Sequence, residues 1–524
     1  MRDVDEVKVL EPVCHPRVAS FPKPPRALQA ADNGTLEVEL IVEVLSAQYA
    51  VATGRRRLIR RRRLDTFDHR LGAAGLRLEH QIVASGERLV LGRLDGSSTV
   101  AAPVRDLRWP ALADSLPQCS LRDAVTAVAG IRALLVVSDE KRRVQRLELH
   151  NKNGKTVARV ELDEPSSAAG APAEVWVRAL LGYDEQARRA ARLLTGAGLL
   201  AAEDSVDTLA GTVPPTAPGD RDAAAAALLT RVLNDFLATM RENLPGLLDD
   251  VDTEFLHDFR VAVRRTRATL KLGRPALPAV VRRRWEPDFK WLGDLTTPVR
   301  DLDVYQLNLP TMAGWLVSAN PADLNPFELH LRSRRTSEHH VLVRALRSAR
   351  FRRLVTQWEE ELARLGDTSN DADREHLSAG RLADRAISLA YGRVARGGAA
   401  IGADSRAVDL HQLRKRCKEL RYALEVFAPV SDDVARKRAV ADLKGLQDVL
   451  GRFQDSEVQR QALRGFAEEM VAEGTPAAAV LAMGELIGHL DAEQDRARRE
   501  FDVAFARFAR PSSLQLMHRL GGRQ

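Results

Sequence analysis

The stretch HDFRVAVRRTRATLK at residues 257–271 recurs as HQLRKRCKELRYALE at residues 411–425. The match runs without a gap from 257–304 to 411–458, at an offset of 154 residues and with 14 identities in 48 positions. Unrelated segments of similar composition seldom keep one register over such a length. The period is too long for a solenoid unit. It predicts two copies of a multi-helix bundle.

Basic residues of the repeat fall on one face of a predicted helix, because they are spaced three or four residues apart. They are His257, Arg260, Arg264, Arg267 and Lys271 in the first copy, and His411, Arg414, Lys418 and Arg421 in the second. One interpretation is a solvated face. Like charges at this spacing repel by a few tenths of a kcal/mol per pair, so solvated faces usually mix signs. Two almost purely basic stripes in one register favour an anionic partner.

The pattern H-x-x-R-x-x-x-R/K-x-x-R is similar to a motif of the CHAD domain. The later Arg300-Asp301-Leu302-Asp303, Asp448 and Asp455 are part of the same resemblance. The resemblance covers about 223–515. It implies two four-helix bundles related by a pseudo-twofold axis, with a basic surface that binds inorganic polyphosphate. The residues expected to bind polyphosphate are His257, Arg260, Arg264, Arg265, Arg267, Lys271, Arg282, Arg283, Lys290, His411, Arg414, Lys415, Lys418, Arg421, Arg436, Lys437 and Lys444. The histidines are expected to donate hydrogen bonds to phosphate, or to form an inter-helix hydrogen bond that holds the two halves together. Metal binding is disfavoured by their basic neighbours.

The N-terminal part has a different periodicity. Residues 36–44 alternate apolar and acidic side chains, which predicts a strand, and 88–91, 146–150 and 157–163 also have strand patterns. Asn151-Lys152-Asn153-Gly154 predicts the turn of a hairpin. Residues 184–202 predict a helix.

Several segments of this part resemble the CYTH domain, the triphosphate tunnel fold. They include Glu37-x-Glu39 and LDTFDHRL at 64–71 followed by Ala74-Gly75. The resemblance implies a closed antiparallel β-barrel that holds a divalent metal ion and a triphosphate. The sequence departs from the family pattern where Ile41 replaces a lysine, and where Glu79 and Gln81 replace basic residues. Two unit charges about 4 Å apart interact by roughly 4 kcal/mol at an effective dielectric of 20, so these changes weaken triphosphate binding.

A run of arginines, Arg55–Arg57 and Arg60–Arg63, has two interpretations. It could contact a polyanion, or it could be a solvated edge strand that deters pairing with another chain.

The predicted organisation is an α+β chain with a tail at 1–30, a CYTH-like barrel at 31–205 and a linker at 206–222. An all-α CHAD region follows at 223–515, with repeats at about 223–365 and 377–515. Three scattered cysteines predict neither a disulfide framework nor a zinc site.

The sequence predicts a non-catalytic protein that binds inorganic polyphosphate and needs no cofactor. One alternative is a triphosphatase in the CYTH-like part, which would require Mg²⁺ or Mn²⁺ held by Glu37 and Glu39. Another is nucleic-acid binding, which fits the net charge of +7 but not an aromatic content of 5%. No apolar stretch is long enough for a membrane span, so no membrane partner is expected. The expected location is the cytoplasm, with polyphosphate granules as a specific site.

Overall fold

The computed structural model describes residues 26–30, 38–94, 99–166, 173–201, 220–369 and 377–521. The chain divides into two compact units, 1–214 and 215–524. Residues 1–25 of the predicted tail and 206–219 of the predicted linker lie outside the described residues. Residues 26–30, which the composition assigns to the tail, instead form a strand.

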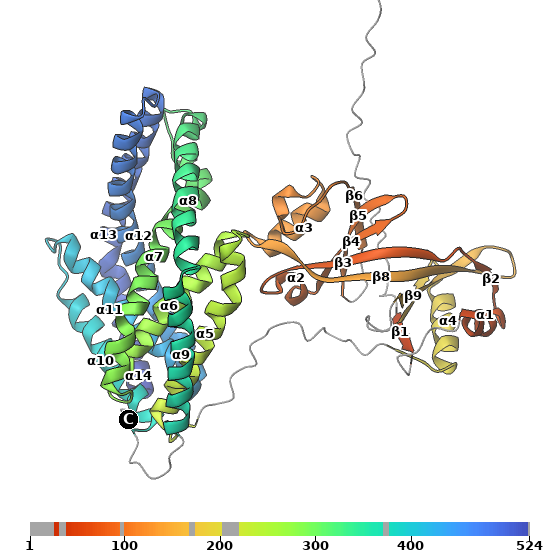
Figure 1. Ribbon diagram of the computed structural model, residues 1–524, viewed down its shortest axis with the longest axis horizontal. Helices are drawn as coiled ribbons and strands as arrows, with labels where there is room; N and C mark the ends of the chain where they lie inside the picture. Colours follow the sequence, from red (N-terminus) through yellow and green to blue (C-terminus); the bar gives the residue numbers. More distant parts are fainter. Residues whose placement is uncertain are drawn as a thin grey trace, which may run out of the picture. The chain divides into compact units, whose positions relative to one another are not determined.

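The first unit contains one antiparallel sheet (Figure 1). In spatial order its main strands are β11 (Leu199–Ala201), β1 (Arg26–Ala30), β10 (Glu174–Ala179), β9 (Thr156–Pro165), β8 (Ala133–His150), β3 (Arg57–Thr66), β4 (Leu76–Val83), β5 (Gly86–Arg93) and β6 (Thr99–Val104). Two short strands, β2 (Ala50–Thr53) and β7 (Ala111–Leu112), pair with β8. In the described residues the sheet is an antiparallel half-barrel with edges at β6 and β11, which confirms the predicted antiparallel N-terminal domain (Figure 1).

One face of this sheet is apolar and carries the helices of the unit. Leu147, Val160 and Leu162 belong to a core formed with α1 (Val38–Ser46) and α4 (Asp184–Gly196). Leu78 and Leu89 belong to a second core with α2 (Arg70–Ala73) and α3 (Ser120–Ala129). Because side chains alternate along a strand, the residues between these apolar positions point to the opposite, polar face.

The strand predicted over 36–44 is wrong, because the described residues from Val38 onward form helix α1. Ile41 and Leu45 are buried in its core, and Val38 and Val42 pack beside them. These four positions are spaced as on one face of a helix with 3.6 residues per turn. The alternation of apolar residues with glutamates in the same stretch hides this helical spacing. Ile41 therefore does not occupy a tunnel lysine position, and it is a core residue. The strands predicted at 88–91, 146–150 and 157–163 and the hairpin turn at 151–154 are confirmed in β5, β8 and β9.

The second unit is all helical and consists of two halves. The first half contains α5 (Ala225–Leu248), α6 (Thr253–Leu272), α7 (Ala279–Ala313), α8 (Asn325–Leu346) and α9 (Ala349–Ser369). The second contains α10 (Ala379–Ala399), α11 (Ala407–Val426), α12 (Asp433–Ala472), α13 (Ala477–Phe508) and α14 (Pro511–Leu520). Adding 154 to the first and last residue numbers of α6 gives those of α11. The same offset takes the first residue of α5 to that of α10, and the first residue of α7 to that of α12.

The two halves share cores and contacts. The second parts of α7 and α12 pack with α8 and α13 in one apolar cluster. Within it, the Tyr305 hydroxyl donates a hydrogen bond of 3.2 Å to the Gln459 carbonyl. Helix α6 also packs against α11, its counterpart. The two stripe helices are therefore neighbours, although 154 residues separate them.

Candidate functional site

Arg264 on α6 and Lys418 on α11 are counterparts in the repeat, and they lie close to one another. The Arg264 guanidinium sits 5.9 Å from the ring centroid of Tyr422, one turn along α11 from Lys418. Its charge also helps to lower the pKa of Lys418. A residue can face its own counterpart only near the axis that relates two copies. This pair therefore marks the pseudo-twofold axis of the helical unit.

Lys418 is the most perturbed base at this axis. Burial, followed by the charges of Arg414 and Arg264, lowers its pKa from 10.5 to about 8, and Asp455 opposes this shift. The structure therefore concentrates positive charge around a half-buried amine. Such an arrangement destabilises the charged amine unless an anion binds beside it.

Arg260 and Arg414 lie on either side of the axial pair. The Arg260 Nη1 donates hydrogen bonds to Thr296 Oγ1 at 3.0 Å and Thr297 Oγ1 at 2.9 Å, which orients it along α7. Arg414 Nη2 lies 3.0 Å from Asp455 Oδ1 on α12. Each arginine is therefore held by the next helix of its own half: Arg260 on α6 by α7, and Arg414 on α11 by α12.

The aspartates of the two motifs have equivalent surroundings. Burial raises the pKa of Asp301, and Arg260 and Arg300 oppose the rise. Burial likewise raises the pKa of Asp455, and Arg414 and Lys418 oppose it. The two carboxylates lie among five basic side chains, so the cluster has an excess of positive charge. These side chains are Arg260, Arg264, Arg300, Arg414 and Lys418.

Among the described residues, neither His257 nor His411 forms a hydrogen bond between the two halves. His411 Nδ1 is hydrogen-bonded to Gln454 Oε1 at 2.6 Å, which links α11 to α12 within the second half. Burial, followed by the charge of Arg300, lowers the pKa of His257. Neutral His257 can donate one hydrogen bond to an anion but adds no charge near neutral pH.

The other predicted basic residues divide into two groups. Those that form ion pairs with carboxylates are Arg265, Lys271, Arg282, Lys290, Arg421, Arg436 and Lys437. Those without an ion pair among the described residues are Arg267, Arg283, Lys415 and Lys444. Two of the pairs, Arg265–Glu425 at 3.0 Å and Lys271–Glu419, connect α6 to α11. These pairs fix the helices that present the axial residues.

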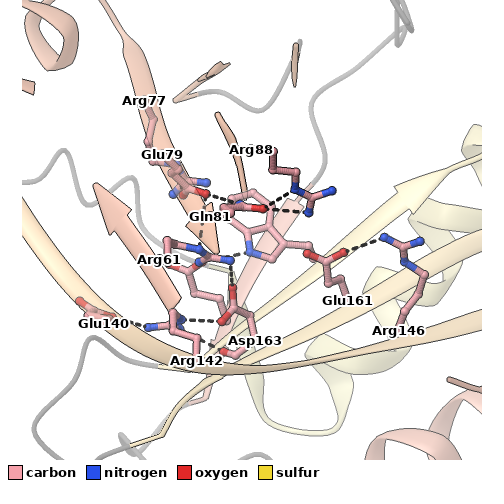
Figure 2. Close-up of polar contacts among 12 residues, drawn as sticks. Arg61, Arg77, Glu79, Gln81, Arg88, Glu140, Arg142, Arg146, Glu161 and Asp163 are labelled. Carbon is pink, nitrogen blue, oxygen red and sulfur yellow. Dashed lines mark hydrogen bonds and ion pairs between the residues drawn. The ribbon is translucent and has the colours of Figure 1, made fainter. Parts of the chain in front are cut away.

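The polar face of the N-terminal sheet forms a second charged cluster, which the sequence did not predict (Figure 2). Arg61 on β3 reaches Asp163 Oδ2 on β9 at 2.6 Å and Glu79 Oε2 on β4 at 3.4 Å. Burial lowers the pKa of Arg61, but Glu79 and Asp163 outweigh it and hold the pKa above its usual value. Arg142 Nε donates to the other oxygen of Asp163 at 2.5 Å, and its Nη1 donates to Glu140 at 3.0 Å. The basic residues missing at 79 and 81 are therefore replaced by arginines from other strands.

Glu79 and Gln81 continue this network along β4. Gln81 Nε2 donates to Glu79 Oε2 at 2.6 Å, and Arg88 Nη2 donates to Gln81 Oε1 at 2.8 Å. Arg77 lies 3.3 Å from Glu79 and stacks 5.4 Å from the Trp176 ring centroid. Figure 2 shows these side chains linked from strand to strand. The carboxylates are thus bound to arginines, which leaves them poorly suited as metal ligands.

The arginine run is not a solvated edge, because β3 lies between β8 and β4. Arg61 is buried in the network, whereas Arg60 and Arg62 pair with Asp139 on the other face. Glu39 is exposed on helix α1, and Glu37 lies outside the described residues. Across the described residues, no group of three or more His, Cys, Asp or Glu side chains could hold a metal ion. In this part of the chain, the described carboxylates of the sheet are paired with arginines and offer no such group for the divalent metal of the triphosphatase alternative.

Residues 231–464 match the family model of the CHAD domain. The helical unit therefore carries a CHAD domain, which confirms the prediction from the motif. No curated protein matched the chain.

Solved structures are similar to each unit at low identity. The CHAD domain of the plant Ricinus communis has 24% identity and a TM-score of 0.45, over 59% of this chain and 95% of that one. PptA from Streptomyces chartreusis has 19% identity and a TM-score of 0.41, over 54% of this chain and 99% of its own. A candidate adenylyl cyclase from Hippeastrum, described as having a dominant triphosphatase activity, has 13% identity and a TM-score of 0.25. That match covers 34% of this chain and 90% of that one.

Among the described residues, no helix is long and apolar enough to cross a membrane.

Proposed function

We propose that the helical unit binds inorganic polyphosphate at the basic cluster on the pseudo-twofold axis. The cluster, called the axial cluster below, consists of Arg260, Arg264, Arg414 and Lys418. The resemblance of the motif to the CHAD domain implies polyphosphate as the anion, and the geometry supports a linear polyanion. Two equivalent sets of cations on neighbouring helices can contact successive phosphates on either side of the axis.

The observation that carries this proposal is the approach of Arg264 to Lys418. Neither side chain has an ion pair among the described residues, although other cations on the same helices do. Burial and neighbouring arginines already lower the pKa of Lys418. Bringing like charges together costs free energy that a bound phosphate chain would recover. The arginines suit this ligand because their planar forks match phosphate oxygens.

The test is a salt-titrated binding assay with long-chain polyphosphate and the variant Arg264→Gln/Lys418→Gln. This variant removes like-charge repulsion, so loss of binding would not follow from a weaker fold. We expect at least about a tenfold loss of affinity, since charged hydrogen bonds contribute roughly 1.5–3 kcal/mol each. The slope of log K against log salt should fall by about 1.4, because each phosphate contact on a single strand contributes roughly 0.7.

The matched control is Arg332→Gln/Arg496→Gln, which removes the same charge from α8 and α13. These arginines form exposed ion pairs within their own helices, with Glu328 and Glu493. The control should bind polyphosphate like the wild type. Equal losses in both variants would mean that binding follows net charge and would refute a site at the axial cluster.

Two further arms test the alternatives. Single-stranded RNA in the same assay tests nucleic-acid binding, and tighter binding to RNA than to polyphosphate would favour it. Release of phosphate from tripolyphosphate with Mg²⁺ or Mn²⁺, if it survives in Arg264→Gln/Lys418→Gln, would identify an enzyme in the N-terminal unit.

A further inference from the structure

A cavity of about 590 Å³ lies between α5, α7 and α9 in the first half of the helical unit. Its wall is mainly apolar and includes Leu237, Leu244, Phe351 and Leu354. Binding sites for small molecules are typically apolar cavities of about 300–1,000 Å³ with a few polar groups. The cavity is remote in sequence from the stripe residues of α6.

The internal repeat provides a comparison, because the second half has counterparts of these wall residues. The offset of 154 residues relates Leu237 to Tyr391 and Leu354 to Phe508. In the second half, the rings of Tyr391 and Phe508 pack with centroids 5.6 Å apart. In the first half, two smaller leucines occupy those positions and both face the cavity.

A second pair of counterparts shows the same difference. Phe351 corresponds to Phe505, and Leu244 corresponds to Gly398. Phe505 lies so close to Gly398 that a Cβ added there would be 2.0 Å from the ring. The ring therefore fills the space over the second half's helix α10. In the first half, Leu244 and Phe351 both line the cavity.

The mouth of the cavity is basic. Arg347 and Arg352 line it, both are exposed, and neither forms an ion pair with any described residue. Arg347 corresponds to Phe501, which is only 2% exposed in the second half. A third arginine at the rim, Arg241, pairs with Glu359. One half thus has aromatic packing where the other has a cavity with two unpaired cations.

A polar group inside the cavity wall also lacks a partner. Trp358 lines the cavity and is fully buried. Its indole N–H has no hydrogen-bond acceptor among the described residues. A buried donor without an acceptor is costly, so this wall is not packed as an ordinary core would be.

From these contacts we infer that the cavity binds a single-chain amphipathic anion. The alkyl chain would occupy the apolar space between α5, α7 and α9, and the anionic head would lie against Arg347 and Arg352. The shared chemistry is one negative head on an unbranched chain, either a carboxylate or a phosphate monoester. This site is separate from the axial cluster, so its existence does not depend on polyphosphate binding.

The experiment is calorimetric titration of the full chain with dodecanoate and dodecyl phosphate below their micelle concentrations. Dodecanol and dodecyltrimethylammonium serve as neutral and cationic probes. We expect one site that prefers the anions by at least about tenfold, in line with charged hydrogen bonds. Shortening the chain to ten and eight carbons should weaken binding by about fourfold per methylene, from roughly 0.8 kcal/mol each. The anion that binds more tightly identifies the head group.

Three variants locate the ligand. Arg347→Gln should weaken anion binding about tenfold and leave dodecanol binding unchanged. Leu237→Tyr/Leu354→Phe restores the aromatic pair of the second half and should abolish binding of every alkyl probe, with circular dichroism to check folding. Arg353→Gln, on α9 but outside the cavity wall, should behave like the wild type. The inference is wrong if the wild type binds no anion, or if the alcohol or the cation binds as tightly. It is also wrong if Arg347→Gln and Arg353→Gln have equal effects.

Discussion

Lys418 makes polyphosphate binding depend on pH in a way that one conservative substitution removes. In the free protein its pKa is about 8, because of burial and then the charges of Arg414 and Arg264. A phosphate chain beside the amine would return the pKa toward 10.5. Lys418 therefore takes up a proton on binding whenever the solution is near or above pH 8, and binding must weaken as pH rises.

The magnitude follows from the two pKa values. At pH 7 the amine is protonated in both states, so it adds no pH dependence. At pH 9 about one tenth of the free protein has Lys418 protonated, whereas nearly all of the complex does. The affinity should therefore fall about tenfold between pH 7 and pH 9. At pH 8 binding should take up about half a proton.

Lys418→Arg is the informative substitution, since an arginine stays charged throughout this range. The variant should bind polyphosphate at pH 7 about as well as the wild type and keep that affinity at pH 9. Other groups that titrate near pH 8, such as the α-amino group, remain present in the variant and are controlled by it. Burial lowers the pKa of His257 in the free protein, and any proton that His257 takes up on binding is shared by the variant and controlled by it in the same way.

The assay is fluorescence anisotropy with end-labelled long-chain polyphosphate at pH 7, 8 and 9 and constant ionic strength. Calorimetry at pH 8 in two buffers of different ionisation enthalpy measures the proton uptake. A wild-type affinity that is flat from pH 7 to pH 9 would show that Lys418 takes up no proton when polyphosphate binds. An equal tenfold fall in Lys418→Arg would place the titrating group elsewhere.

Two predictions concern the fold. Asp303 is fully buried and lies 2.6 Å from Arg335, which also bonds Asp250. Asp303→Ala leaves only the Nε–H of Arg335 without a partner, so it should destabilise the helical unit by about 1–3 kcal/mol in urea denaturation, and no measurable loss would show that the pair is not needed. Gly398→Ala should cost about 1–3 kcal/mol in the same assay, because the new methyl group would collide with Phe505. The control is Gly484→Ala, in a helix and with no neighbour within 4 Å of an added Cβ, which should stabilise the unit by roughly 0.5–1 kcal/mol. Equal effects of the two substitutions would show that Phe505 does not pack against Gly398.

The repeat predicted the helical unit well because both copies keep the same local signals. Spacings of three and four residues placed the basic stripe on one helix face, and α6 and α11 have equivalent bounds. The sequence could not show which cations remain unpaired. Arg265 and Lys271 belong to the predicted stripe region, but their partners Glu425 and Glu419 lie in the other half. Only the packing of α6 on α11 reveals these pairs.

The N-terminal unit was predicted less well, for two physical reasons. Residues from Val38 to Leu45 satisfy both an alternating and a helical pattern, and burial of α1 against the sheet decides for the helix. The charged network was missed because its members come from separate strands. Arg61 and Asp163 are about a hundred residues apart in sequence, and strand order alone brings them together. A run of arginines carries no signal that one of them is buried among carboxylates.

Lysine acetylation measured by mass spectrometry shows whether polyphosphate binds on the axial cluster. A lysine with a pKa of about 8 is largely unprotonated at pH 8.5, so Lys418 should react readily in the free protein. Saturating polyphosphate should slow its acetylation at least about tenfold, by covering and protonating the amine. Lys155, exposed in the N-terminal unit, should react at an unchanged rate. If polyphosphate binds and leaves the rate at Lys418 unchanged, polyphosphate binds elsewhere on the protein.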